Sequence, residues 1–66
     1  MPPKYPNITV QLTGHDSNAF MILGLCQRAA ANAGISKQEI AAFFQEATSG
    51  DHDLLIQTAM RWFNCE

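Results

Sequence analysis

The chain is poor in positive charge. Only four of its 66 residues are basic, and each stands in a different segment: Lys4, Arg28, Lys37 and Arg61. Proteins that bind duplex nucleic acid gain much of their affinity from clustered Lys and Arg that neutralise phosphates. Because this chain has no such cluster and a net charge of −2, we predict that duplex nucleic acid is not a partner. One arginine with a few backbone N–H groups can still hold a small anion.

Cysteine is scarce as well. Cys26 and Cys65 lie far apart and form no Cys-x-x-Cys pair, so neither structural zinc nor any other cofactor is expected. Cys26 falls inside an apolar run, which predicts that its side chain is buried as apolar filler. Nucleophilic catalysis would need an exposed and activated cysteine. We therefore predict a protein that is not an enzyme.

Metal-ligating patterns are also missing. The two histidines occur in His15-Asp16 and in Asp51-His52-Asp53. The side chains of residues adjacent in sequence rarely point toward one common metal ion. The spacings typical of zinc sites, such as His-x-x-x-His, do not occur. These side chains are expected in solvated loops, and no metal site is predicted.

No hydrophobic run is long enough to cross a bilayer. The longest apolar stretch, 19–26, has eight residues, against roughly 20 for a transmembrane helix. It is not preceded by the basic region of a secretory signal. We expect no membrane contact and a cytosolic, reducing location.

The length leaves room for one domain, predicted over 8–66, with a flexible lead-in over 1–7 that contains Pro2, Pro3 and Pro6. A chain of this size buries only about 60% of its unfolded surface. Its core rarely supplies more than about 3–5 kcal/mol, and short domains often add a partner subunit. Self-association is therefore expected.

The periodicity predicts an α+β, mainly helical fold in which one N-terminal strand precedes three helical segments. Residues 8–13 alternate between apolar and polar side chains, as in a half-buried strand. The helices are expected to start at the capping residues 16–18, at the capping box Ser36 to Glu39, and at Asp51, with Gly34 ending the first helix. Apolar residues surround the first two turns of the first helix, where Phe20, Met21 and Leu25 lie off its main apolar face. Such a helix is central in its domain or covered by a second chain.

The segment 60–65 has two interpretations. We favour a helix that continues to about Phe63, with strand 8–13 pairing with its copy in another subunit. Alternatively, Trp62 and Phe63 favour a terminal strand, and this strand would pair with 8–13. Either arrangement covers the open edge of a lone strand.

Several segments carry a family resemblance, among them 10–20, Leu23-Gly24, Ala33-Gly34, 46–51 and Trp62. They resemble a family of short, uncharacterised bacterial and phage-associated proteins, which commonly has Gly where this chain has Ser17 and Tyr where it has His52. The resemblance covers most of the chain from Val10 onward. It implies a bacterial or phage-infected host cell and a role in conflict between phage and host, and it brings no established activity.

The junction between strand and first helix is the main candidate site. Backbone N–H groups and the helix dipole favour an anion at a helix N-terminus, and side chains or backbone could assist from Thr13, Gly14, His15, Ser17 and Asn18. Asp16 could instead occupy this position as a plain cap. Arg28 either pairs with a neighbouring subunit, reaches a ligand phosphate or stays solvated, and Trp62 is either core or a stacking platform.

Two functions follow from these features. The first is a non-enzymatic, homo-oligomeric binding protein that holds a small anionic ligand, such as a signalling nucleotide. The alternative is a protein-interaction module that docks its apolar first helix or its open strand on a larger partner. A small transcriptional regulator is disfavoured because basic residues are so sparse.

Overall fold

Three helices and two short strands make up the part of the chain that the structure describes. The computed structural model describes residues 2–12 and 18–66. The elements in chain order are β1 Tyr5–Val10, α1 Ala19–Asn32, α2 Lys37–Ala47, α3 His52–Trp62 and β2 Phe63–Cys65. This is the α+β, mainly helical fold that the sequence predicts, with the C-terminal strand present.

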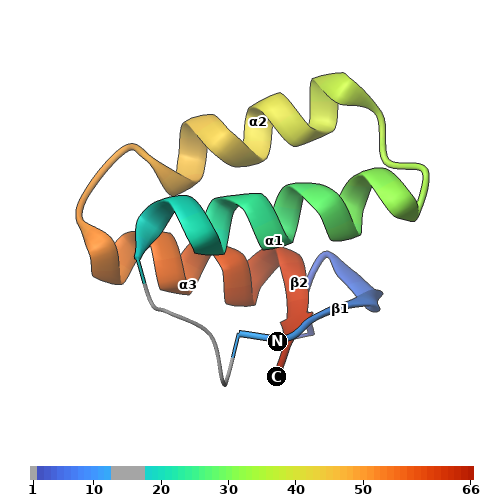
Figure 1. Ribbon diagram of the computed structural model, residues 1–66, viewed down its shortest axis with the longest axis horizontal. Helices are drawn as coiled ribbons and strands as arrows, with labels where there is room; N and C mark the ends of the chain where they lie inside the picture. Colours follow the sequence, from blue (N-terminus) through green and yellow to red (C-terminus); the bar gives the residue numbers. More distant parts are fainter. Residues whose placement is uncertain (1, 13–17) are drawn as a thin grey trace.

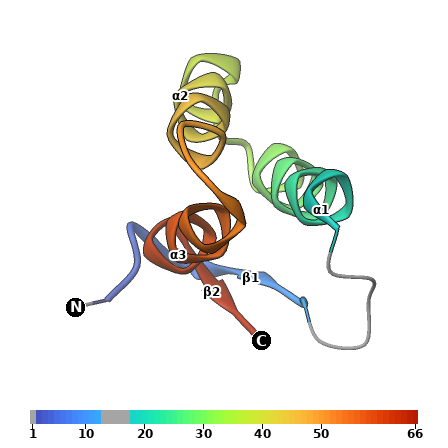
Figure 2. The same cartoon turned by 90° about the vertical axis from the view of Figure 1, so that its left-hand side faces the viewer.

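The three helices pack together and the strands lie against two of them. Along the chain the helices reverse direction at each connection, so that α1 and α3 run the same way and α2 runs in the opposite direction (Figure 1). Seen along their axes, the three helices form a triangle, and the strands lie on the side of α1 and α3 that faces away from α2 (Figure 2).

Each helix begins at a residue that the sequence marks as a cap. The cap bonds run from the N–H of Met21 to Asn18 Oδ1 (2.8 Å), of Glu39 to Ser36 Oγ (3.2 Å) and of Leu54 to Asp51 Oδ1 (3.0 Å). The capping box is only half formed, because the Glu39 carboxylate contacts Lys4 and Tyr5. These side-chain oxygens satisfy N–H groups that have no partner within the helix.

The favoured expectation for the strand, pairing with another subunit, was wrong. β1 pairs in parallel with β2 of the same chain, with Val10 opposite Cys65. The helix ends at Trp62, and strand geometry at Phe63 buries its ring, which is 2% exposed, against Phe43 at 5.2 Å between ring centroids. At Phe63 the backbone changes from helix to strand, and the Phe63 ring is buried in the small core, which stabilises the fold.

The strand also lies three residues earlier than predicted, at 5–10 in place of 8–13. Residues 5–7, expected in the lead-in, belong to β1 because Tyr5 pairs with Phe63. The register shifts between Tyr5 and Thr9, and Pro6 lies in this irregular stretch, where a missing N–H is tolerated. Leu12 still donates to Glu66 O at 2.7 Å beyond the strand.

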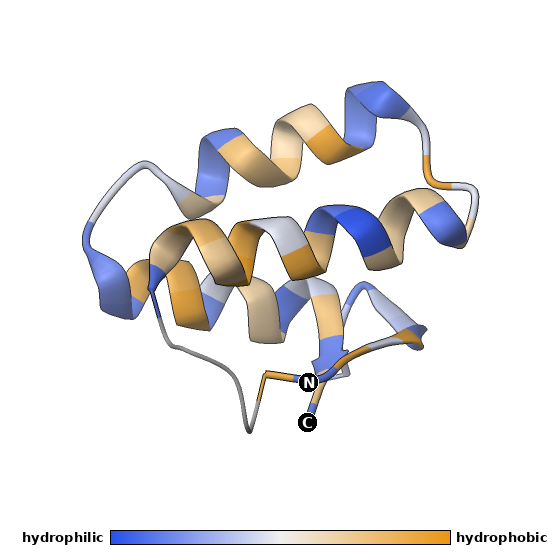
Figure 3. Cartoon of the chain, viewed as in Figure 1, coloured by the Kyte–Doolittle hydropathy of each residue, from blue (hydrophilic) through white to orange (hydrophobic). Residues whose placement is uncertain are grey.

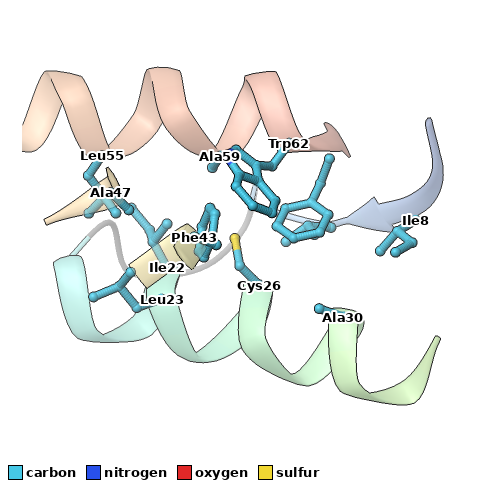
Figure 4. Close-up of a cluster of buried hydrophobic side chains, with 12 residues drawn as sticks. Ile8, Ile22, Leu23, Cys26, Ala30, Phe43, Ala47, Leu55, Ala59 and Trp62 are labelled. Atoms are coloured by element: carbon cyan, nitrogen blue, oxygen red, sulfur yellow. The ribbon is translucent and has the colours of Figure 1, made fainter. Parts of the chain in front are cut away.

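Aromatic and aliphatic side chains from every element form one core. Figure 4 shows Phe43 of α2 lying between Ile22 and Cys26 of α1 and the Ala59 side of α3. Phe43 is 1% exposed and packs edge to face against the Trp62 ring at 5.5 Å. The buried helix positions recur at helical spacing: Ile22, Leu23, Cys26, Ala30, Phe43, Ala47, Leu55, Thr58, Ala59 and Trp62.

Two glycines give a matched test of backbone conformation. Gly34 has φ of +85° just after α1, whereas Gly24 lies inside α1 with no atom within 4 Å of an added Cβ. We expect Gly34→Ala to lower the free energy of unfolding by about 1–2 kcal/mol, the cost of a left-handed residue. Gly24→Ala should raise it by about 0.5–1 kcal/mol. Urea unfolding of both variants checks this, and changes of the same sign would contradict it.

Candidate functional site

The predicted site residues fall into three groups. Thr13, Gly14, His15 and Ser17, together with Asp16, lie outside the described residues. Asn18 and Arg28 lie on the outer side of α1, where both are exposed. Trp62 lies in the core. The structure therefore tests how the last three are arranged.

Asn18 and Arg28 line the same hollow. This first hollow, of about 380 Å³, runs along α1 and is lined by Asn18, Phe20, Met21, Gly24, Leu25 and Arg28. The spacing of 18, 21, 25 and 28 places these side chains on one helix face. Asn18 Oδ1 is taken up by the helix cap, which leaves its amide NH₂ as a donor near one end of the hollow, about three turns of helix away from Arg28.

A second hollow, of about 490 Å³, lies between α1 and β1. Its floor is formed by residues 7–11 and its wall by Leu25, Arg28, Ala29, Asn32 and Ala33. Leu25 and Arg28 line both hollows, so the two hollows adjoin each other. We call the residues lining the two hollows the α1–β1 surface.

The α1–β1 surface is apolar at one end. Phe20 is 89% exposed and Met21 is 40% exposed, although both lie in the first turn of α1. In Figure 3 the N-terminal half of α1 is coloured mainly as hydrophobic, and hydrophilic colour appears in its later turns. The first two turns of α1 have apolar residues nearly all round, and a core of this size covers only one face of the helix.

Arg28 supplies the charge of this surface. It is the one charged side chain among the described residues that line the two hollows. Neither of the ion pairs found within 2–12 and 18–66 includes Arg28. Its guanidinium is therefore available for an anionic group of a ligand or a partner.

β1 presents one open edge. Val10 O accepts from Glu66 N at 2.9 Å and Leu12 N donates to Glu66 O at 2.7 Å, so these groups face β2. Because backbone groups of adjacent strand residues point to opposite edges, the N–H and C=O of Thr9 and Gln11 face away from β2. The sheet within the described residues has two strands, and no third strand covers this edge. Sequence patterns miss these groups, since the direction of a backbone group depends on the pairing.

Trp62 lies in a different environment from Asn18 and Arg28. Its ring is 8% exposed, and its Nε1 donates to Glu46 Oε2 at 3.0 Å. Lys4 Nζ lies 4.4 Å from the centroid of one of its rings and 2.8 Å from Glu39 Oε2, which also accepts from the Tyr5 hydroxyl. Trp62 therefore connects the core to a polar contact that holds the start of β1.

The two cysteines are free thiols. Cys26 is fully buried, and burial raises the pKa of its thiol to about 12. At neutral pH this group is a protonated, apolar side chain, as the sequence predicts. Over residues 2–12 and 18–66, no cluster of three His, Cys, Asp or Glu is arranged to hold a metal ion. No helix in this part of the chain is long and apolar enough to cross a membrane.

A comparison with protein-family models, curated proteins and solved structures finds no match for the chain. The family resemblance therefore stays a prediction.

The contact among Lys4, Tyr5 and Glu39 predicts how stability changes in acid. Hydrogen bonds, first from Lys4 and then from Tyr5, hold the pKa of the Glu39 carboxyl below its ordinary value. A lowered pKa in the folded state gives stability that is present above the ordinary value of 4.5 and is lost as pH falls through the lowered one. We expect Glu39→Gln to be less stable than the wild type at pH 7 and to lose less stability between pH 7 and pH 3.

Urea unfolding at the two pH values measures this difference. Lys4→Gln serves as the matched control, because it removes the first donor while leaving the carboxylate. Between pH 7 and pH 3, this variant should lose less stability than the wild type but more than Glu39→Gln. Equal losses of stability in acid for the wild type and Glu39→Gln would show that this contact does not affect folding.

Proposed function

We propose that this chain is a non-enzymatic binding protein that acts by protein–protein contact through the α1–β1 surface. The observation that supports this most strongly is Phe20, an aromatic side chain 89% exposed at the start of α1. It lies beside Met21 in a hollow that continues to Arg28. Aromatic residues, Met and Arg are the types enriched at protein interfaces.

The shape of the surface favours a protein over a small molecule. Both hollows are wide open to solvent, whereas a small-molecule pocket encloses most of its ligand. A protein partner covers a broad area, typically about 800 Å² on each side. That is somewhat less than a fifth of the 4431 Å² accessible surface of the chain, so a protein partner of this size would cover exposed residues around the two hollows as well as the hollows themselves.

A second copy of the chain is one such partner. The sequence predicts a homo-oligomer partly because β1 would otherwise lack a pairing strand. Since β1 pairs with β2 of the same chain, this reason no longer applies. The homo-oligomer is still supported by the exposed apolar end of α1.

A small anionic ligand is the second candidate, supported by one observation. Asn18 and Arg28, two of the residues predicted from the sequence, line the same hollow of about 380 Å³. The guanidinium can pair with an anionic group while an aromatic part of the ligand packs on Phe20. A nucleotide has both features.

Photo-crosslinking at position 20 tests the protein-interaction proposal. We expect a benzoylphenylalanine in place of Phe20, in protein expressed in its native cell, to give one discrete crosslinked product. The same group in place of Met60, which is 58% exposed on α3, should give none above background. A product of twice the chain mass would identify a second copy as the partner.

Phe20→Ser is the companion variant and should abolish binding of that partner. Because the Phe20 side chain is exposed, the free energy of unfolding of this variant should stay within about 0.5 kcal/mol of the wild-type value. Similar crosslinking at positions 20 and 60, or no product at either, would contradict the proposal.

Thermal unfolding against a panel of nucleotides, cyclic dinucleotides included, tests the second candidate. A ligand at 100 times its dissociation constant should stabilise the protein by about 2.7 kcal/mol. Arg28→Gln should lose this response, whereas Arg61→Gln, on α3 and outside both hollows, should keep it. If no nucleotide stabilises the wild type, the ligand hypothesis fails.

A further inference from the structure

We propose that the partner docks an extended, acidic peptide segment on the open edge of β1 as a third strand of the sheet. The inference deepens the proposed function and depends on it, because it names the kind of segment that the α1–β1 surface takes. Three observations lead to it: the direction of the β1 backbone groups, the shape of the second hollow and the charge of Arg28.

The backbone of β1 is arranged to accept a strand. The bonds of Val10 and Leu12 with Glu66 fix which edge faces β2, and the N–H and C=O of Thr9 and Gln11 point to the other edge. An extended peptide satisfies such groups with main-chain hydrogen bonds, the recognition mode called β-augmentation. These bonds bind a backbone regardless of its side chains.

The second hollow lies along this edge. Residues 7–11 form its floor, and α1 forms its wall with Leu25 and Ala29 among the lining side chains. Side chains of an added strand alternate between two faces, so every second residue would meet this wall. Because Leu25 and Ala29 are apolar, we infer a preference for apolar residues at alternate positions.

Charge gives the remaining specificity. Arg28 lines the hollow and takes part in neither of the ion pairs found in the described part of the chain. A carboxylate on the peptide would form a charge-assisted hydrogen bond with it. An acidic residue next to alternating apolar residues is therefore the segment that fits this surface.

A second copy fits this edge less well. In each copy α1 forms the wall of the hollow beside its own β1, so two copies joined edge to edge would place two helices over one pair of strands. A peptide segment brings no helix with it. Self-association through the edge is accordingly an alternative outcome of the test.

Selection from a displayed library of random ten-residue peptides, followed by fluorescence anisotropy with the selected peptides, tests the inference. We expect peptides with an acidic residue among alternating apolar ones. Thr9→Pro removes an N–H on the open edge and should weaken binding at least ten-fold. Thr9→Val, which loses only the hydroxyl that accepts from Asn64 Nδ2 at 3.2 Å, should bind within two-fold of the wild type.

A second pair of variants leaves the strand untouched, in case Thr9→Pro does not fold. Ala29→Arg places a long side chain in the hollow and should weaken binding at least ten-fold, whereas Ala31→Arg, exposed on α1 and outside both hollows, should not. Arg28→Gln should remove the preference for an acidic peptide over its amide counterpart.

The outcomes separate this inference from the proposed function. If the library yields no peptide, or if Ala29→Arg and a folded Thr9→Pro bind as well as the wild type, the strand-addition inference is overturned. A discrete crosslink at position 20 would then still support protein binding through the first hollow. If the wild type forms dimers that Thr9→Pro and Ala29→Arg both abolish, the edge joins two copies and the peptide inference is wrong.

Discussion

The pairing of β1 with β2 is the constraint on which the rest of the structure depends. The two strands come from opposite ends of the described chain, with Val10 opposite Cys65. They can pair only when the three helices between them have brought the C-terminal segment back to β1. Long-range pairing of this kind is entropically costly before the core forms. The pairing therefore connects the arrangement of all three helices to the edge that β1 leaves open.

The start of β1 is held in place by side-chain contacts as well as by the backbone hydrogen bonds to β2. Lys4 lies over the Trp62 ring and pairs with Glu39, and Tyr5 donates to the same carboxylate. Because its carboxylate contacts Lys4 and Tyr5, Glu39 does not make the capping-box hydrogen bond with Ser36 N–H that its position predicts. The exposed ion pair contributes little by itself, but it fixes the N-terminal segment over the end of the core at Trp62.

A small core explains the surface that α1 presents. Ile22, Cys26 and their neighbours face α2 and α3, and little apolar mass remains to cover the opposite face of α1. Phe20 is therefore left in solvent beside the hollow that leads to Arg28. An exposed aromatic side chain and an open strand edge are each a liability for a monomer, and a partner that covers the whole α1–β1 surface would remove both.

Local patterns in the sequence determined the elements: the alternation around Ile8, the caps at Ser36 and Asp51, and the glycine at position 34. Each depends on neighbours within a few residues, so the helices, the mainly helical α+β class and the burial of Cys26 followed from the sequence alone. Only the tertiary structure decided that Phe63 leaves the helix to pair β2 with β1, because that choice depends on a ring finding space beside Phe43. The same holds for the candidate surface. The apolar excess of α1 is visible in the sequence, but the open edge at Thr9 and its place beside Arg28 follow from contacts between residues far apart in the chain.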